Sequence, residues 1–371
     1  MTTSPFIVRQ QRLAQALRSA GLDALLLNPG PSLVYLTGLH LHLMERPMVV
    51  VFTPTQPPLI VLPQLEAAKL IGIPYPLQSF FYTDDPATWP GAFQQALAAL
   101  DGGTIGVEPT RLRFLELRLV EGAAPRARCI SAESILEPLR IAKDASEIAF
   151  MRQAVQIAQE ALQDALAVAR VGMTERQLAA ELTVQLLRHG STPEMPFGPI
   201  VSAGPNSANP HASPSDRPLT PGDLLVIDWG AAAGGYISDL TRTFAIGEVE
   251  AEFEQIAAIV EAANAAGRAA AAPGAAASVV DDAARGVIER AGYGAQFFHR
   301  TGHGIGMEGH EAPYIRAGSA QLLSPGMSFT VEPGIYLTGR GGVRIEDNVV
   351  ITESGAETLS DLPRKLIRIA G

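Results

Sequence analysis

Two apolar segments of this 371-residue chain, each interrupted by a glycine-rich stretch, carry acidic residues at mirror-image positions. The first segment, LLVIDWGAAAGGYISDLTRTF, covers residues 224–244, and its central GAAAGG is a turn signal between two strand-like runs. Asp228 and Asp239 are equidistant from the point between Ala233 and Gly234. A regular hairpin would therefore place the two carboxylates opposite each other, with Cβ atoms roughly 4.5–5.5 Å apart.

The second segment, FTVEPGIYLTGRGGVRIEDNVVI, covers residues 329–351 and repeats the pattern with Glu332 and Glu346 equidistant from Gly339. Like charges directly opposed in a sheet destabilise it, and a buried carboxylate without a partner is costly. Solvated hairpin acids are the ordinary alternative, and a β-bulge would shift either register. Because both pairs follow apolar strands, the pattern favours divalent metal ions as the compensating charge.

A histidine-containing, glycine-rich stretch lies between the two hairpins. The chain has seven histidines, and three of them, His299, His303 and His310, fall within twelve residues among glycines. Glycines on both sides of His303 would let the backbone approach a metal site closely. Four carboxylates and one imidazole could hold two divalent ions, and the remaining histidines would be free for acid–base work.

The pattern of helices and strands changes near residue 138. Residues 1–138 alternate helical and strand patterns, which predicts a small three-layer α/β domain. Residues 139–371 group helices apart from hairpins, which predicts a second domain of the α+β class. Two capping boxes mark the first helices of this second domain, Asp144 with Glu147 and Thr174 with Gln177.

Charge and cysteine content exclude several classes of protein. The net charge is −10, which argues against a nucleic-acid partner but is compatible with carboxylates gathered around cations. Cys129 is the only cysteine, so neither an internal disulfide nor a cysteine zinc cluster can form within the chain. The sequence shows neither the apolar run of a signal peptide nor that of a membrane span, so we expect a cytoplasmic protein with no membrane partner.

At these residues the sequence resembles the pita-bread metallopeptidases, peptidase family M24, which includes methionine aminopeptidase, aminopeptidase P and prolidase. The resemblance covers residues 143–371 and rests, in order, on DWGAAAGGYISDLTRTF, HRTGHGIG, HEAPYI, VEPGIY and VRIEDNVVIT. The N-terminal domain and the linker LRIAKDASEI resemble the Xaa-Pro branch, prolidase and aminopeptidase P. The resemblance implies a creatinase-like α/β domain, a pita-bread catalytic domain, a homodimer and cleavage of peptide bonds before proline.

The resemblance also implies two divalent metal ions and five ligands, Asp228, Asp239, His303, Glu332 and Glu346. Asp239 and Glu346 would bridge the ions, Asp228 would bind one ion, and His303 and Glu332 would bind the other. An oxygen-rich shell with one imidazole favours Mn²⁺, while Co²⁺, Zn²⁺ and Fe²⁺ stay open. Creatinase and the histone-chaperone relatives have lost this set, so metal-free catalysis and a purely binding role are both disfavoured here.

Catalytic roles follow from the same resemblance. Glu332 would pass a proton towards the leaving proline nitrogen after attack by metal-activated water. His211 matches a histidine that binds substrate around the scissile bond, and His310 matches one that contacts the scissile carbonyl region and assists proton transfer. His299 matches a third histidine, which lines the pocket.

Three further residues are candidates for the substrate pocket. Tyr314 and Tyr336 could contact the proline ring, with ordinary core packing as the alternative. Arg344 precedes Glu346 by two residues on the same strand face and could orient the metal-binding acids. A simple cross-strand salt bridge is the alternative for Arg344.

The choice between dipeptidase and aminopeptidase P depends on a cation for the dipeptide carboxylate. Several prolidases have an arginine after HExP, where this chain has Tyr314. Arg46 is the only cationic residue between Arg18 and Lys69, counting lysine and arginine. We expect Arg46 to pair with the dipeptide carboxylate, so that the enzyme leans towards prolidase activity. A surface position, or a salt bridge with Glu45, is the alternative, and it would favour aminopeptidase P.

Overall fold

The computed structural model describes residues 4–369, and the chain divides into two compact units, Met1–Arg140 and Ile141–Gly371. No helix within the described residues is long and apolar enough to cross a membrane. The two units are α/β and α+β respectively, as the sequence predicts.

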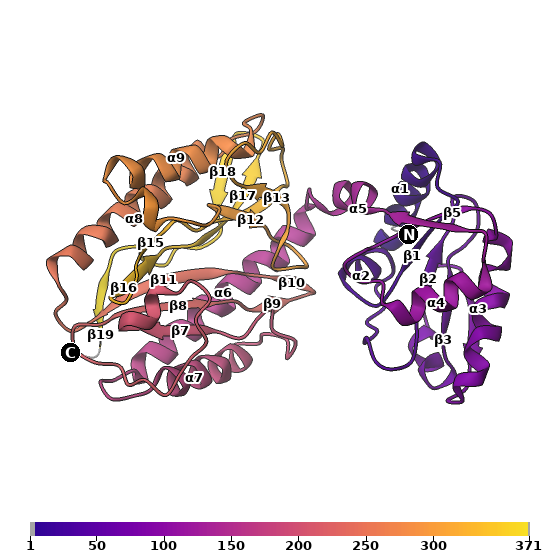
Figure 1. Ribbon diagram of the computed structural model, residues 1–371, viewed down its shortest axis with the longest axis horizontal. Helices are drawn as coiled ribbons and strands as arrows, with labels where there is room; N and C mark the ends of the chain where they lie inside the picture. The colour runs from indigo at the N-terminus through magenta and orange to yellow at the C-terminus, as the bar shows by residue number, and fades with distance from the viewer. Residues whose placement is uncertain (1–3, 370–371) are drawn as a thin grey trace. The chain divides into compact units, whose positions relative to one another are not determined.

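The N-terminal unit contains one mixed sheet with helices packed around it (Figure 1). Its strands are β1 (Ala24–Leu27), β2 (Val49–Phe52), β3 (Leu59–Pro63), β4 (Gln78–Tyr82), β5 (Thr104–Val107) and β6 (Arg128–Ser131), in the order β4-β3-β2-β1-β5-β6. Its helices are α1 (Pro5–Ala20), α2 (Pro31–Thr37), α3 (Trp89–Leu97), α4 (Phe114–Ala123) and α5 (Glu133–Arg140). Phe93 of α3 and Val120 of α4 join Leu26 of β1 in one core, while Leu25, on the opposite face of the same strand, is also buried. Burial on both faces makes this a three-layer unit.

The C-terminal unit is built from two larger sheets with a pair of helices outside each. The helices are α6 (Ala145–Val168), α7 (Glu175–Arg188), α8 (Ala251–Ala270) and α9 (Ala277–Arg290). The first sheet has the order β19-β11-β8-β7, from β7 (Ile200–Ala203), β8 (Leu224–Trp229), β11 (Leu240–Ile246) and β19 (Ile367–Ile369). The second has the order β13-β12-β14-β17-β18, from β12 (Gly302–Gly304), β13 (Glu311–Ile315), β14 (Ser328–Val331), β17 (Asp347–Thr352) and β18 (Gly355–Thr358). Two short ribbons pair β9 (Ala232–Ala233) with β10 (Tyr236–Ile237) and β15 (Gly334–Leu337) with β16 (Gly341–Arg344).

Separate apolar clusters attach each helix pair to its sheet. Leu162 of α6 and Leu182 of α7 pack with Trp229 of β8, and Val280 of α9 packs with Phe329 of β14. Within this unit, Figure 1 shows α6 and α7 on one side of the strands and α8 and α9 on the other. The strand ends that carry the acidic residues therefore lie between two helical layers. Both predicted capping boxes are confirmed at the N-termini of α6 and α7.

The register of the second hairpin confirms the prediction. Gly334 pairs with Arg344 in the ribbon and Val331 pairs with Asp347 beyond it, so the same count places Glu332 opposite Glu346. The loop of residues 338–340 has Gly339 at its centre with a positive φ of 76°. Arg340 N donates to Leu337 O at 2.9 Å, so Gly339 is the third residue of this turn, a position where a positive φ favours glycine.

The predicted register of the first hairpin is wrong by two residues on one strand. Asp228 pairs with Thr241, and Asp239 lies just before β11. The cause is the turn, because Gly234 and Gly235 are its two central residues and both have positive φ, 57° and 83°. A two-residue turn of this kind centres between the glycines and not one residue earlier.

Candidate metal centre

The acidic residues of the two hairpins gather around His303, which lies in the middle of β12. His303 Nε2 lies 3.4 Å from Glu332 Oε1 and 3.8 Å from Asp239 Oδ2. Asp239, His303 and Glu346 each offer one ligand atom, and these three atoms lie within 4.8 Å of one another. Asp239 directly precedes β11 of the first sheet, whereas His303 lies in β12 and Glu346 directly precedes β17 of the second, so strands of both sheets meet at a common point.

Glu346 and Asp228 are held at this point by hydrogen bonds from neighbouring side chains. Thr241 Oγ1 donates to Glu346 Oε2 at 2.7 Å, and the two residues also form an isolated backbone bridge between the sheets. Arg344 Nη2 lies 2.6 Å from Asp228 Oδ2, and Arg344 Nε donates to Thr241 Oγ1 at 3.1 Å. Arg344 therefore connects Asp228 to the hydroxyl that holds Glu346.

The carboxyl groups of the cluster resist ionisation. Burial, followed by the charge of Glu346, raises the pKa of Asp239 well above its ordinary value. Burial and then the charge of Glu332 raise the pKa of Glu346 in the same way. Burial also raises the pKa of Glu332 to about 7 and, despite the nearby charge of Arg344, raises that of Asp228. The cluster thus concentrates more negative charge than the guanidinium of Arg344 offsets.

The residues fit a divalent-metal site. Asp228 Oδ1 is buried without a hydrogen-bond partner among the described residues, and the carboxyl groups destabilise one another's charged forms. Burial, followed by the neighbouring His310, lowers the pKa of His303 to about 3, so its imidazole is neutral and able to bind a metal at pH 7. Carboxylate oxygens with one neutral imidazole suit a divalent cation that prefers oxygen and nitrogen ligands to thiolates.

The glycines around His303 have a packing role. A Cβ atom at Gly302 would lie 1.9 Å from Thr330 O, and one at Gly304 would lie 2.2 Å from Ala312 O. Only glycine lets β12 fit between its two neighbouring strands here. The sequence predicts a close backbone approach to a metal site; the close approach that the structure shows is to the carbonyls of β13 and β14.

His299 forms a hydrogen-bonded chain with Tyr336 and Arg344. Its Nδ1 lies 2.8 Å from the carbonyl oxygen of Arg300, so Nδ1 carries the proton and Nε2 accepts from the Tyr336 hydroxyl at 2.9 Å. Arg344 Nη1 donates to the same hydroxyl at 3.1 Å. Burial lowers the pKa of His299 to about 4, which matches this neutral tautomer.

His310 and His211 lie at the open side of the cluster, and both are exposed. The centroid of the His310 ring is 4.0 Å from that of His303. Burial and the charge of Arg300 lower the pKa of His310. Arg344 Nη1 donates to the carbonyl oxygen of Pro210 at 3.2 Å, which fixes the backbone directly before His211.

The remaining substrate-pocket candidates differ in their surroundings. Tyr336 is buried, and burial raises its pKa to about 12. Tyr314 is 37% exposed, and the Arg300 guanidinium lies 4.9 Å from the centre of its ring. Arg46 belongs to the N-terminal unit, where it pairs with Glu45 at 2.5 Å and Asp84 at 2.6 Å.

Sequence reasoning missed several side chains that support the site. Lys143 Nζ lies 2.6 Å from Glu311, beside His310, and both side chains are largely buried. The buried Glu175 carboxylate accepts hydrogen bonds from Ala203 N, Ser215 N and the side chain of Asn206, which fixes the ends of the segment containing His211. These pairs join residues far apart in sequence. The one sequence signal for such a pair is a charged residue in an otherwise apolar segment, which indicates that a buried partner exists but does not identify it.

Comparison with known proteins supplies the family. The sequence model of metallopeptidase family M24 matches residues 149–353, and that of the creatinase/prolidase N-terminal domain matches residues 9–142. The probable dipeptidase PepE of Mycobacterium tuberculosis is 37% identical over 366 residues, covering 95% of this chain and 94% of the relative. The Xaa-Pro dipeptidase of Lactobacillus helveticus is 32% identical over 357 residues, covering 96% and 97% of the two chains.

Solved structures of both Xaa-Pro branches share this fold. A prolidase from Thermococcus sibiricus has a TM-score of 0.93 at 31% identity, with 99% of this chain and 100% of that chain covered. An X-Pro aminopeptidase from Thermotoga maritima has a TM-score of 0.85 at 30% identity, with 97% and 99% covered.

A creatinase-type α/β unit joined to a unit with a buried cluster of acids and one imidazole defines a metal-dependent hydrolase. The chain belongs to metallopeptidase family M24, and it is therefore a peptidase of the pita-bread fold, as the sequence resemblance predicts.

Proposed function

We propose that this chain is a dinuclear metal-dependent Xaa-Pro dipeptidase, a prolidase. The meeting of Asp239, Glu332 and Glu346 with His303, and the charge of Asp228 beside Asp239, carry the catalytic part of the proposal. Similarity over almost the whole chain to proteins named dipeptidase and Xaa-Pro dipeptidase supports the substrate. We further propose Mn²⁺ as the metal and a cytoplasmic homodimer as the working form.

In this proposal, the two divalent ions would be held by Asp228, Asp239, His303, Glu332 and Glu346, with Asp239 and Glu346 contributing to both. Bound divalent ions would lower the pKa of water and polarise the scissile carbonyl. Glu332 moves the proton towards the leaving proline nitrogen, which has no hydrogen of its own. Arg344 supplies positive charge beside Asp228.

Three histidines complete the substrate site in this proposal. His310, at the open side next to His303, donates a proton or hydrogen bond to the scissile carbonyl region. His211 contacts the substrate around the scissile bond from the segment that Glu175 and Arg344 fix. His299, Tyr336 and Tyr314 line the space for the proline ring.

Arg46 is proposed to bind the carboxylate of the dipeptide. Its present partners, Glu45 and Asp84, are mostly exposed, and exposed ion pairs contribute only about 0–1 kcal/mol. Exchanging them for a substrate carboxylate therefore costs little. A charge-assisted pair contributes about 1.5–3 kcal/mol, which corresponds to about ten- to a hundredfold in selectivity.

The proposal is tested by assaying Xaa-Pro dipeptides against Xaa-Pro-Yaa tripeptides with added Mn²⁺. Preferential hydrolysis of dipeptides supports the prolidase. Cleavage of tripeptides alone would establish aminopeptidase P, and release of methionine from Met-Ala peptides alone would establish a methionine aminopeptidase. A chain that binds no divalent ion with micromolar affinity would be a non-catalytic binding protein.

Arg46→Ser separates the two Xaa-Pro activities further. The variant should raise KM for dipeptides about ten- to a hundredfold and leave KM for tripeptides nearly unchanged. Arg126→Ser is the control, because Arg126 is an arginine of the same unit that also pairs with an acid, Asp101, at 2.8 Å. An equal effect on both substrates, or none, removes Arg46 from the site.

A further inference from the structure

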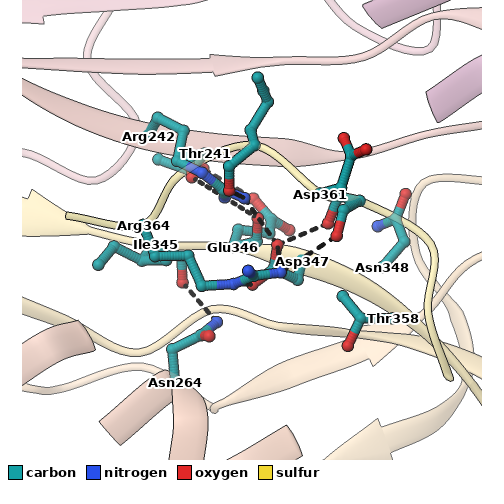
Figure 2. A network of polar contacts seen from close by, with 12 residues as sticks. Thr241, Arg242, Asn264, Ile345, Glu346, Asp347, Asn348, Thr358, Asp361 and Arg364 are labelled. Carbon is teal, nitrogen blue, oxygen red and sulfur yellow. Dashed lines mark hydrogen bonds and ion pairs between the residues drawn. The ribbon is translucent and has the colours of Figure 1, made fainter. Parts of the chain in front are cut away.

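A buried polar network lies directly behind the metal-binding acids and does not contain any of their carboxylates as members. Four of its side chains are called the backbone clamp here: Arg242 and Asp347, which pair with each other, and Asn264 and Asn348, which bond to the backbone beside the acids. All four are at most 2% exposed, so neither solvent nor substrate reaches them. Figure 2 shows this network from close by.

Asn348 binds the backbone of Asp239. Its Oδ1 accepts from Asp239 N at 3.1 Å, and its Nδ2 donates to Asp239 O at 2.7 Å. One side-chain amide thus satisfies both backbone groups of a proposed bridging residue. Asp239 lies outside the ladder of β11, so these two bonds take the place of strand pairing.

Asn264 and Arg242 do the same for the two glutamates. Asn264 Nδ2 donates to the carbonyl oxygens of Val331, at 2.9 Å, and Ile345, at 3.4 Å, which directly precede Glu332 and Glu346. Arg242 Nη1 donates to Glu346 O at 2.7 Å and to Thr241 O at 2.8 Å (Figure 2). Three of the four acids therefore have clamped backbones.

Asp347 connects the clamp to the C-terminal segment. Its carboxylate lies 2.8 Å from Arg242 Nη2 and 2.7 Å from Arg364 Nε, and it accepts from Ser360 Oγ at 2.5 Å. Arg242 also donates to Leu362 O at 3.1 Å. The segment that crosses behind the site near the end of the chain is thus part of the same network.

The network is better suited to fixing geometry than to adding stability. Replacing a buried ion network by apolar residues is often neutral or stabilising, so its presence is weak support for a stability role. A metal site needs ligands held within a few tenths of an ångström, and the residues behind the ligands provide this.

We propose that the backbone clamp sets the spacing of Asp239, Glu332 and Glu346, with Asp347 and Asn348 as positioning residues for the two-metal site. The proposal rests on the proposed metal-dependent function. It assigns to these side chains a role in metal affinity and coordination geometry, apart from any role in folding.

The test uses the full-length metal-free protein and its Asp347→Asn and Asn348→Ser variants. Co²⁺ is titrated by calorimetry, and the visible absorption spectrum of the Co²⁺-loaded protein reports coordination geometry. Each variant should bind Co²⁺ about ten- to a hundredfold more weakly, with an altered spectrum. If Asp347→Asn fails to fold, Asn348→Ser, which introduces no uncompensated charge, decides alone.

Asp223→Asn is the matched control. Asp223 is a largely buried acid of the same unit, bonded to Arg217 at 2.6 Å and 2.8 Å, and it does not border any of the proposed ligands. This variant should lower Tm and leave Co²⁺ affinity and spectrum unchanged. If the clamp variants also lower Tm but keep the Co²⁺ affinity and spectrum of the wild-type protein, the positioning role is overturned. Failure of the wild-type protein to bind Co²⁺ would instead overturn the proposed function itself, and the clamp's role with it.

Discussion

Replacing Arg344 by methionine tests how the charge of the acidic cluster is balanced. Arg344 is buried, pairs with Asp228 at 2.6 Å and donates to Thr241, Tyr336 and Pro210. Methionine keeps a long unbranched side chain and removes the cation. Without metal, the variant leaves Asp228 as a buried carboxylate that has lost its ion pair.

The loss should depend on metal. Removing one partner of a buried ion pair costs about 3–5 kcal/mol. For a unit of roughly 150–250 residues, each kcal/mol corresponds to about 2–4 °C in Tm, so the metal-free variant should melt about 6–20 °C below wild type. In the metal-bound protein, bound cations compensate Asp228, and only the cost of the lost neutral hydrogen bonds, about 0.5–1.5 kcal/mol each, remains.

The assay is thermal unfolding at pH 8 with chelator and, separately, with saturating Mn²⁺. The mildly alkaline pH limits rescue of the variant by protonation of Asp228. Arg340→Met is the control, since Arg340 pairs with the exposed Glu250 and Glu252 and its loss should change stability little in either condition. A loss with Mn²⁺ equal to or greater than the loss without it would refute charge compensation and show that Arg344 mainly orients the acids.

Three further predictions concern the catalytic unit. Asp239→Asn and Glu346→Gln should each abolish peptide hydrolysis at saturating Mn²⁺, because each removes a carboxylate from the cluster around His303; substantial turnover would contradict their assignment as shared ligands. His310→Ala should fold and bind metal normally but lose about 10²–10⁴-fold in kcat, and a fall in metal stoichiometry would make His310 a ligand instead. His299 has its pKa lowered to about 4 from an ordinary 6.5. His299 therefore adds no pH dependence to stability above pH 6.5. Below pH 6.5 the unfolded chain takes up the proton first, so the free energy of unfolding should fall by about 1.4 kcal/mol per pH unit down to pH 4. Urea unfolding of wild type and His299→Gln at pH 7 and pH 5 measures this loss, which the variant should lack.

Local sequence signals determined most of the catalytic fold. The capping boxes of α6 and α7 need only residues three apart, and the second hairpin needs only the position of Gly339 in its loop. The predicted register of the first hairpin is wrong although the sequence carries the turn signal. Gly234 and Gly235 form a two-residue turn, so the turn centres between them. Recognising that pair as the turn would have moved the expected partner of Asp228 from Asp239 to Thr241.

Long-range polar contacts could not be predicted in the same way. Arg242 and Glu346 meet across more than a hundred positions, and no local pattern specifies that contact. Asn264 is the exception, since it lies on the buried stripe of α8 with Val260 and Gly267. A polar side chain at that position needs a buried partner, so the sequence could have indicated a bond without identifying Val331 as its acceptor.

The sequence predicts that Arg46 binds the substrate, and the structure shows the two acids with which Arg46 pairs in the free protein. Arg46 is singled out as the only lysine or arginine between Arg18 and Lys69. The alternative of a salt bridge with Glu45 is present, together with a second one to Asp84. Those ion pairs do not exclude substrate binding, because the Glu45 and Asp84 side chains are 72% and 71% exposed and hold Arg46 weakly. Selectivity for dipeptides then depends on whether Arg46 binds the substrate carboxylate more tightly than it binds the two acids. The KM comparison for Arg46→Ser tests this.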